Sequence, residues 1–105
     1  MTSHITTHVL DAVAGVPAAG VGLRLSRHHA DGVTDQDGRN RELGPQRLDP
    51  GTYRIVFATG EYFAAQGRRT FYPEITIDFV VEEGQDHYHV PILLSPFAYS
   101  TYRGS

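Results

Sequence analysis

Short runs of β-branched and aromatic residues, each ended by glycine, proline or aspartate, constrain this sequence more than any other feature. Val, Ile, Thr, Tyr and Phe favour extended backbone, whereas Gly, Pro and Asp turn the chain. The pattern predicts strands at residues 5–10, 21–27, 33–34, 52–58, 75–81, 87–94 and 99–102. Seven or eight short strands of this kind predict an all-β fold, an antiparallel β-sandwich whose edge strands invite pairing with a second subunit.

Turns and one helix separate the predicted strands. Turns are expected at residues 15–17, 31–32, 37–38 and 49–51, where glycine stands close to aspartate or proline. Residues 61–66 lie between Gly60 and Gly67 and are compatible with a helix of about one and a half turns. Pro91 has no N–H for a ladder, which predicts that residues 87–94 form an edge strand or a bulged one.

Length and composition narrow the class of protein. The chain has 105 residues, so we assign residues 1–105 to a single domain. It contains no cysteine, which excludes disulfides and thiolate metal sites and favours a cytoplasmic location. The start of the sequence lacks the pattern of a secretory signal, and no apolar run is long enough to span a bilayer. With a net charge of −3, neither a nucleic-acid partner nor a membrane is expected.

Six histidines stand out in a chain that has no lysine and no cysteine. His87 and His89 are two residues apart on a predicted strand, so their side chains face the same way, about 6.8 Å apart along it. His4 and His8 share the same parity at the first strand. Two histidines at this spacing, together with a third histidine, could act as ligands of a zinc ion. The alternative, that one member of each pair is solvent-exposed, is favoured, and no metal is predicted.

Arginines provide the other candidate functional residues. Arg39 directly follows Asp37-Gly38, so it lies at the exit of a tight turn where a side chain is aimed in a defined direction. Spacing alone nevertheless favours a surface arginine. The case for a functional role is no stronger for Arg41, Arg47, Arg68 and Arg69. His28-His29 is expected to form a solvated turn, and composition predicts that residues 100–105 form a frayed tail. No nucleophile elbow, phosphate loop or dinucleotide fingerprint is present, so the residues alone identify no reaction.

Four segments, taken together, resemble the 5-hydroxyisourate hydrolases, the transthyretin-related family of purine degradation. They are Thr-His-Val-Leu-Asp at residues 7–11, Asp-Gly-Arg at residues 37–39, His-Tyr-His-Val-Pro at residues 87–91 with Leu-Ser-Pro at residues 94–96, and Tyr-Arg-Gly-Ser at residues 102–105. They occur in the family's order and extend over nearly the whole chain. The resemblance implies a transthyretin-like sandwich of two four-stranded sheets with one short helix. It also implies a homotetramer, a dimer of edge-to-edge dimers with active sites where the dimers meet.

The resemblance implies the site residues as well. Carried over position by position, the catalytic set is His8, Arg39, His89 and Ser105, and the substrate-binding set is His8, Arg39 and Tyr102. The tail is then expected to fold into the site instead of fraying. His87 matches a position that we interpret as structural. No cofactor and no metal are implied, and the partner is a small-molecule substrate, 5-hydroxyisourate.

One segment departs from the family's pattern. Residues 28–49 are short for the family, and polar residues follow Arg39 where apolar or small ones are commoner. Either Arg39 keeps its place with a rebuilt loop behind it, or Arg41 takes over its role. The Asp-Gly that precedes Arg39 favours the first interpretation.

The implied reaction is hydrolysis of a ring lactam to 2-oxo-4-hydroxy-4-carboxy-5-ureidoimidazoline. Water attack at a carbonyl needs a base for the water and a donor for the developing oxyanion. We expect His8 and His89 to flank the water and Arg39 to hold the substrate by a forked contact. Tyr102 is expected to fix the substrate and Ser105 to relay a proton. The alternative function is a non-catalytic, transthyretin-like carrier of a small ligand.

Overall fold

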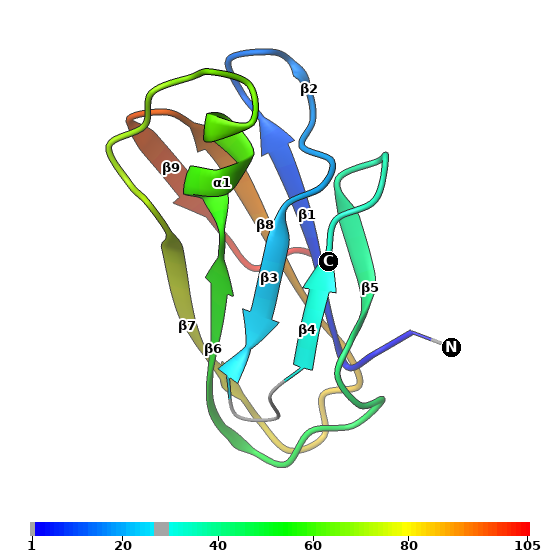
Figure 1. Ribbon diagram of the computed structural model, residues 1–105. Coiled ribbons are helices and arrows are strands. Elements are labelled where there is room, and N and C mark those ends of the chain that lie inside the picture. Colours follow the sequence, from blue (N-terminus) through cyan, green and yellow to red (C-terminus); the bar gives the residue numbers. More distant parts are fainter. Residues whose placement is uncertain (1, 27–29) are drawn as a thin grey trace.

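The computed structural model describes residues 2–26 and 30–105, which form two β-sheets packed face to face with one short helix at one end (Figure 1). The elements are β1 (Ile5–Asp11), β2 (Val16–Pro17), β3 (Gly22–Leu25), β4 (Ala30–Val33), β5 (Arg39–Leu43), β6 (Gly51–Phe57), α1 (Thr59–Ala64), β7 (Ile75–Val81), β8 (Tyr88–Ser95) and β9 (Ala98–Thr101). The predicted all-β sandwich with one short helix is confirmed. His28 and His29, expected in a solvated turn, lie outside the described residues.

The first sheet has the strand order β2-β1-β8-β9, and β5 also pairs with β1. Because β8 occupies one edge of β1, β2 and β5 share the other edge. β2 pairs near Leu10, and β5 pairs from Ile5 to His8. Five segments therefore fill four positions. The second sheet has the order β4-β3-β6-β7 and is antiparallel. β1 and β8 run parallel to each other, so the first sheet is not wholly antiparallel as the sequence predicts.

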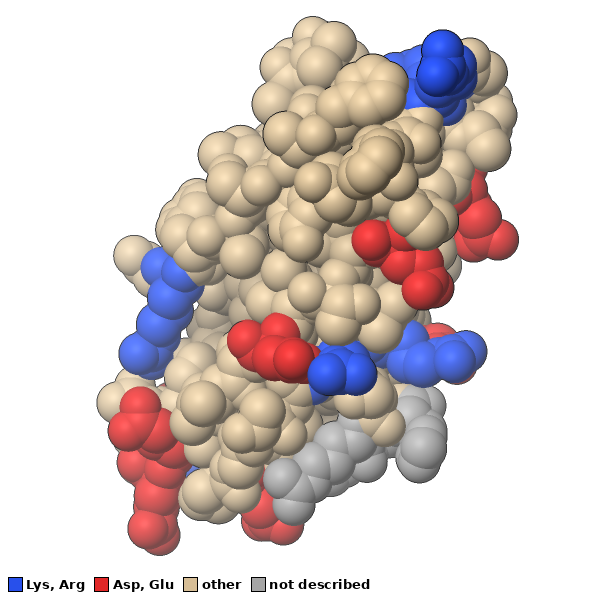
Figure 2. Space-filling view, turned by 90° about the vertical axis from the view of Figure 1, so that its left-hand side faces the viewer, with Lys and Arg blue, Asp and Glu red and all other residues tan. Residues whose placement is uncertain are grey.

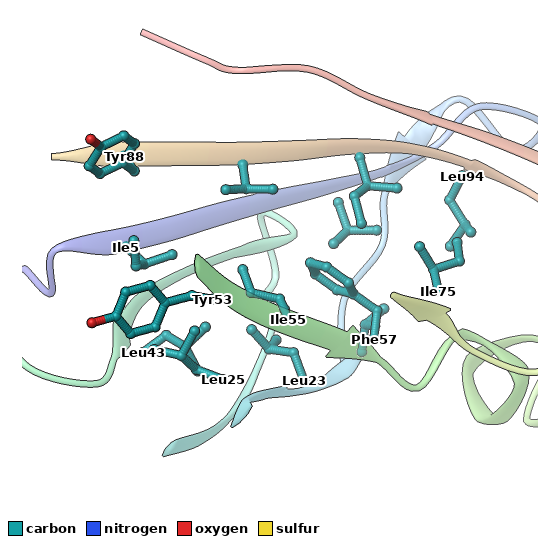
Figure 3. Packing of buried hydrophobic residues seen from close by; sticks show 14 of the residues in the cluster. Ile5, Leu23, Leu25, Leu43, Tyr53, Ile55, Phe57, Ile75, Tyr88 and Leu94 are labelled. Carbon is teal, nitrogen blue, oxygen red and sulfur yellow. The ribbon is translucent and has the colours of Figure 1, made fainter. Parts of the chain in front are cut away.

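The core lies between the two sheets and follows the alternation of side chains along each strand. Ile5 of β1 and Leu94 of β8 lie in one buried cluster with Ile55 and Phe57 of β6 (Figure 3). The alternate residues of β1 and β8 consequently point away from the core. This outer face of the first sheet carries the candidate site.

Two predicted turns are short strands instead. Asp31-Gly32 lies in β4, where Asp31 pairs with Arg24 of β3 and its carboxylate accepts a 2.9 Å hydrogen bond from the Arg24 guanidinium. Val16-Pro17 forms β2, which pairs with the end of β1. In both places, pairing with a neighbouring strand overrides the local turn preference.

β5 is a strand that the sequence pattern does not predict, because its first four residues are all polar and only Leu43 is buried. An edge strand needs little apolar surface, since it has one neighbour and one solvated side. The ladder with β1 holds β5 in place. The Asn40 side chain adds to this, because it accepts the Glu42 N–H at 2.9 Å and donates to the Val33 carbonyl at 3.1 Å. The segment behind Arg39 is therefore a strand and not a rebuilt loop.

Pro91 lies inside the first sheet, so the prediction of an edge strand is wrong. Along a strand, the backbone groups of successive residues face opposite neighbours. The His89 carbonyl accepts the Gly104 N–H, so the nitrogen of Pro91 faces that same side. The ladder between β8 and β9 begins only at Ile92, opposite Thr101. Proline is tolerated because it falls in the gap between this ladder and the Gly104 bridge.

The helix α1 begins at Thr59 and not at residue 61. Polar contacts fix it against the end of β1. Tyr62 donates a 2.9 Å hydrogen bond to the Asp11 carboxylate, and Arg68 donates to the same carboxylate at 2.7 Å. No helix in the described ranges is both long enough and apolar enough to cross a membrane.

Candidate functional site

Strands β5, β1 and β8 and the tail bring the predicted residues into one row on the outer face of the first sheet. His8 of β1 is the ladder partner of Arg39 in β5, and Thr6 of β1 is the ladder partner of His89 in β8. Gly104 of the tail forms an isolated bridge with His89 on its other side. Ladder partners share a face, as do residues two apart on one strand. Side chains that are far apart in the sequence therefore stand beside one another.

A tight turn aims the Arg39 side chain. The Asp35 carboxylate accepts the N–H groups of Asp37 at 2.8 Å and of Arg39 at 3.0 Å. The bond from Arg39 is the main cause that lowers the pKa of Asp35. Gly38 has a φ of +74°, and a Cβ there would lie 2.3 Å from the Val9 carbonyl oxygen, so only glycine fits. The Asp-Gly-Arg sequence thus fixes the point at which Arg39 leaves the turn.

The backbone of the same turn fixes the ring of His8. His8 Nε2 lies 2.8 Å from the carbonyl oxygen of Asp37. A carbonyl oxygen can only accept, so Nε2 carries the proton. When the ring is neutral, Nδ1 is therefore its acceptor nitrogen.

His89 lies half-buried at the centre of the row. Its Nδ1 is 2.8 Å from the hydroxyl oxygen of Thr6. Burial is the main cause that lowers the pKa of His89 below its usual value of 6.5, and the positive charge of Arg39, then His87 and His8, lowers it further. A ring that stays neutral near pH 7 keeps a lone pair, which is what a general base requires.

The tail, residues 102–105, folds back beside β8 and is not frayed (Figure 1). The Gly104 N–H donates a 2.8 Å hydrogen bond to the His89 carbonyl. The guanidinium of Arg103 lies 4.7 Å from the centre of the Tyr88 ring, an arrangement in which a cation is attracted to the ring face. A Cβ at Gly104 would lie 2.5 Å from Cδ2 of His89. Only glycine therefore allows the tail to lie this close to the imidazole.

A cavity of about 220 Å³ opens over this row. Its lining includes Thr6, Arg39, Arg41, His87, His89 and Ser105. Neither Arg39 nor Arg41 forms an ion pair with another described residue, so the cavity has an excess of positive charge. Forked arginine donors beside imidazole nitrogens suit a small, planar ligand that is polar or anionic.

The structure places the remaining predicted residues around this cavity. His8 stands next to it through its ladder partner Arg39. Tyr102 is 58% exposed and lines an adjoining cavity of about 310 Å³, which Arg103 also lines. His89 borders both cavities. Arg39, His89 and Ser105 thus share one cavity, with His8 and Tyr102 at its two sides.

Two lining residues carry more weight in the structure than the sequence indicates. Thr6 is not among the predicted site residues, although it stands two residues before His8, as His87 stands two before His89. This shared parity is the signal that could have found it. The second is Arg41, and Arg39 and Arg41 both line the same cavity.

His4 is separate from the row, because β1 begins only after it. Its Nδ1 accepts the Leu48 N–H at 2.7 Å, and its Nε2 donates to the Gln85 carbonyl at 2.8 Å. The ring is buried with both nitrogens bonded, so the expectation from parity that His4 faces the same way as His8 is wrong. Within the described ranges, no three His, Asp or Glu side chains come together in a group that could hold a metal ion.

A larger hollow of about 450 Å³ lies on the outer face of the second sheet. Its lining contains no histidine, and its arginine, Arg24, is paired with Asp31. Groups able to activate water or to receive an anion are therefore found at the smaller cavity.

Comparison with known proteins agrees with this placement. Residues 5–104 match the model of the HIUase/Transthyretin family. The chain is 45% identical over 114 residues to the 5-hydroxyisourate hydrolase of Caulobacter vibrioides, covering 98% of this chain and 99% of that protein. The fold is similar to that of the Klebsiella pneumoniae 5-hydroxyisourate hydrolase, with a TM-score of 0.89, 40% identity and coverage of 98% of this chain and 100% of that one. It is also similar to sea bream transthyretin in complex with thyroxine, with a TM-score of 0.88, 35% identity and coverage of 96% and 94%.

Proposed function

Since the chain belongs to the HIUase/transthyretin family, we propose that it hydrolyses 5-hydroxyisourate in urate degradation, at the cavity that Arg39, His89 and Ser105 line. The observation that supports this most directly is the row of Arg39, His8 and His89 on three adjoining strands. Arg39 and His89 line the small cavity, and His8 stands beside it as the ladder partner of Arg39. Hydrolysis of an amide needs such a base and such a positive charge.

In the mechanism that we propose, a water molecule attacks the lactam carbonyl carbon of the substrate. His89 takes one proton from the water through Nε2, and Nδ1 of His8 accepts the other hydrogen and orients the water. Arg39 donates two N–H hydrogen bonds that converge on the carbonyl oxygen, on which negative charge develops. The C–N bond then breaks, the protonated His89 returns the proton to the ring nitrogen, and the carbon is left as a carboxyl group.

The tail and β5 supply further contacts in this proposal. The Ser105 hydroxyl relays the proton of the newly formed carboxyl group to solvent. Tyr102 fixes the substrate from the adjoining cavity, which His89 also borders. Arg41 places a second cation on the cavity near Arg39.

Activity is tested with 5-hydroxyisourate generated freshly from urate by urate oxidase. The loss of near-ultraviolet absorbance is followed with and without the protein. We expect His89→Ala to lower kcat roughly 10²- to 10⁴-fold, because it removes the base. Arg39→Lys keeps the charge but loses the fork, so it should lower kcat more than Arg41→Lys does.

The controls separate the site from general damage. Arg54→Lys is a matched control, since Arg54 lies on the second sheet and pairs with Asp78. It should leave turnover unchanged. A protein shortened by residues 102–105 should lose the acceleration. Near-complete turnover by His89→Ala would contradict its role as base, and acceleration that survives the shortening would contradict the role given to the tail.

A carrier without catalysis is the second candidate, because the fold is similar to sea bream transthyretin, which was solved with thyroxine. The cavity described here is about 220 Å³ and lined with arginine and histidine. Such a lining suits a small polar molecule better than a large iodinated aromatic one. A folded protein that binds thyroxine tightly and does not accelerate decay of 5-hydroxyisourate would favour the carrier.

We also propose that four copies assemble as a dimer of dimers. β7 and β9 are the outermost strands of their sheets, and such edges can pair with a second copy. Figure 2 shows the side of the molecule on which β7 and β9 lie, and its upper part carries few charged side chains. Light scattering on a gel-filtration column should give a mass of four chains of 11.6 kDa each. A fully active single chain would contradict this assembly.

A cytoplasmic location is the remaining part of the proposal. A chain without cysteine needs no oxidising compartment to fold. Fractionation of cells of the source organism, with an antibody against the untagged protein, tests the location. Recovery with periplasmic or secreted markers would contradict it.

A further inference from the structure

We propose that Thr6 and His87 set the tautomer of His89, so that its cavity-facing nitrogen is a base when His87 is neutral and a hydrogen-bond donor when His87 is protonated. The inference rests on the proposed hydrolysis and adds two positioning residues to it. It follows from one hydroxyl group that two histidines share.

The three side chains form a closed set of hydrogen bonds. The hydroxyl oxygen of Thr6 is 2.9 Å from His87 Nε2 and 2.8 Å from His89 Nδ1. Thr6 is only 5% exposed, so water has little access to this hydroxyl. The ladder between β1 and β8 sets Thr6 opposite His89, and the two imidazole rings lie 6.5 Å apart and within 22° of parallel. The strands therefore fix Thr6 and His89, and His87 directly precedes β8.

The proton count allows two arrangements only. A hydroxyl has one proton to donate and two lone pairs with which to accept. If both histidine nitrogens donated to Thr6, the hydroxyl proton would need a third acceptor, and no other described group lies within hydrogen-bond distance of it. If neither nitrogen carried a proton, one proton would have to serve two acceptors. One of the two nitrogens must therefore be protonated and the other bare.

Each arrangement gives His89 a different role. When Thr6 donates to His87 Nε2, His89 Nδ1 donates to Thr6, and the neutral His89 ring has a bare Nε2 that can accept a proton from water. When His87 donates to Thr6, Thr6 donates to His89 Nδ1, and His89 Nε2 then carries the proton. No described group is hydrogen-bonded to His89 Nε2, so this nitrogen is free to serve the ligand.

Protonation of His87 selects between the two arrangements. The side chain of His87 is exposed, so it exchanges protons with solvent. A protonated ring has an N–H at both nitrogens and can only donate to Thr6, which forces the second arrangement on His89. A neutral His87 can accept from Thr6 and allow the first arrangement.

Charged groups from each neighbouring element bear on this pair. They are Arg39 and Arg41 on β5, His8 on β1 and Arg103 in the tail. Arg39 and His8 raise the cost of a second positive charge on His89. A positive charge on His87 likewise lowers the pKa of His89, so the two rings are not readily charged together.

Nitrogen-15 spectra of the histidine side chains test the coupling without any substrate, because bare and protonated ring nitrogens differ widely in chemical shift. In the unaltered protein we expect His89 Nδ1 to become protonated, and Nε2 bare, over the same pH range in which His87 loses its proton. In Thr6→Val, which removes the hydroxyl at similar volume, the two titrations should separate. In Thr6→Ser they should coincide again. A His89 tautomer that is constant while His87 titrates would overturn the proposal.

Kinetics on 5-hydroxyisourate provide the second measurement. We expect Thr6→Val to lower kcat roughly 10- to 100-fold with a smaller change in KM, as when a residue that orients a catalytic histidine is removed. Thr6→Ser should retain kcat within about 3-fold. Thr34→Val is the matched control, because Thr34 is a buried threonine outside the cavity whose hydroxyl also makes two hydrogen bonds. It should affect stability without moving the His89 nitrogen shifts or the pH profile.

The two measurements separate failure of this inference from failure of the proposed function. An active protein in which Thr6→Val keeps its kcat and its titration behaviour overturns the inference alone. An inactive unaltered protein that still shows coupled nitrogen shifts overturns the hydrolase function and leaves the hydrogen-bond coupling in place. If Thr6→Val unfolds, Thr6→Ser and His87→Gln carry the test. Unchanged titration of His89 in His87→Gln would then contradict the coupling.

Discussion

At Gly104 the chain has no room for a side chain, because a Cβ would lie 2.5 Å from Cδ2 of His89. Gly104→Ala must therefore displace either the tail or the imidazole. We expect kcat to fall at least roughly 10-fold while the thermal midpoint changes little, since the position is at the surface. Gly22→Ala is the control, because its Cβ would meet Ala58 at an ordinary 3.8 Å. Equal kcat for the two variants would contradict the close approach that we describe.

Thr59 shows the opposite situation, a group whose removal should help. Its hydroxyl is buried and has no hydrogen-bond partner among the described residues. Thr59→Val keeps the shape and removes an unsatisfied polar group, so the free energy of unfolding should rise by about 1 kcal/mol. Chemical denaturation of the purified protein measures this. Thr34→Val should shift stability in the other direction, since it deletes a buried hydroxyl with bonds of 2.9 and 2.7 Å.

The acid limb of activity tests whether His87 acts on His89. Burial and Arg39 lower the pKa of His89 below 6.5, so its ring is neutral above that lowered value and becomes charged only as the pH falls through it. In His87→Gln, where no other histidine shares the Thr6 hydroxyl with the base, the midpoint of the acid limb of kcat should therefore lie below 6.5. In the unaltered protein, protonation of either His87 or His89 disables the base, so the midpoint should lie at a higher pH than in His87→Gln. A pH–rate profile that is the same for both proteins would contradict the coupling through Thr6.

Arg39 and Thr6 show what the sequence can and cannot predict about the site. Arg39 follows an Asp-Gly turn, and local turn chemistry is visible in the sequence. Thr6 becomes important only because β1 pairs with β8, and that pairing joins residues 83 positions apart. A buried threonine between two histidines carries no motif of its own. The family resemblance therefore identified His8, His89 and Arg39 as site residues, and only the ladder register of the structure identified Thr6.

At the scale of elements, Asp11 joins the end of β1 to α1 and the segment after it. Its carboxylate is fully buried and accepts bonds from Arg68 and Tyr62. The hydrogen bond from Arg68 is the main cause that lowers the pKa of Asp11 from 3.8 to about 2. Because the pKa of Asp11 is lower in the folded state than in the unfolded state, its ionised form stabilises the protein by about 2 kcal/mol at pH values above the unfolded-state pKa. That contribution is lost as the pH falls from about 4 through about 2.

Asp11→Asn tests this link. At pH 7 the variant should lose at least about 2 kcal/mol of unfolding free energy, and the gap to the unaltered protein should narrow as the pH falls below about 4. Urea unfolding at a series of pH values measures it. Asp78→Asn is the control, since the Asp78–Arg54 pair is exposed and screened by solvent, so its loss should change the unfolding free energy much less. A gap between Asp11→Asn and the unaltered protein that does not vary with pH would contradict the role of ionised Asp11.

The elements that the sequence predicts are those with an apolar alternation of their own. β1, β6 and β7 each alternate or contain buried β-branched residues, and the predicted ranges agree closely with the observed ones. β5 has no such pattern before Leu43, and its pairing with β1 is what makes it a strand. Pro91 misleads for the same reason, because a local rule cannot show that the ladder beside it has a gap. The local pattern is thus sufficient to predict half-buried strands, and it is insufficient where pairing with a neighbouring strand determines the structure.

At the scale of the whole molecule, the outer face of the first sheet is exposed in the single chain and covered in the proposed tetramer. Leu93 of β8 lies on this face, on the same side of the strand as His89, and is 40% exposed. We expect Leu93→Arg to halve the mass in solution and to lower kcat, because the face that carries the site loses its cover. Val33→Arg is the matched control on β4 of the other sheet and should leave the mass unchanged. A four-chain mass for Leu93→Arg would contradict an assembly through this face.

The pairing of β1 with β8 also has a consequence for folding during synthesis of the chain. Contacts between distant parts of a chain form slowly, because a long loop must close before they can be made. During synthesis, β1 is made early, and one of its edges stays open until the ribosome has released β8. The row of Thr6, His8 and His89 is then among the last features to assemble. Substitutions that weaken this ladder prolong an open strand edge, so in the cell they will act first through aggregation of the nascent chain and only then through chemistry.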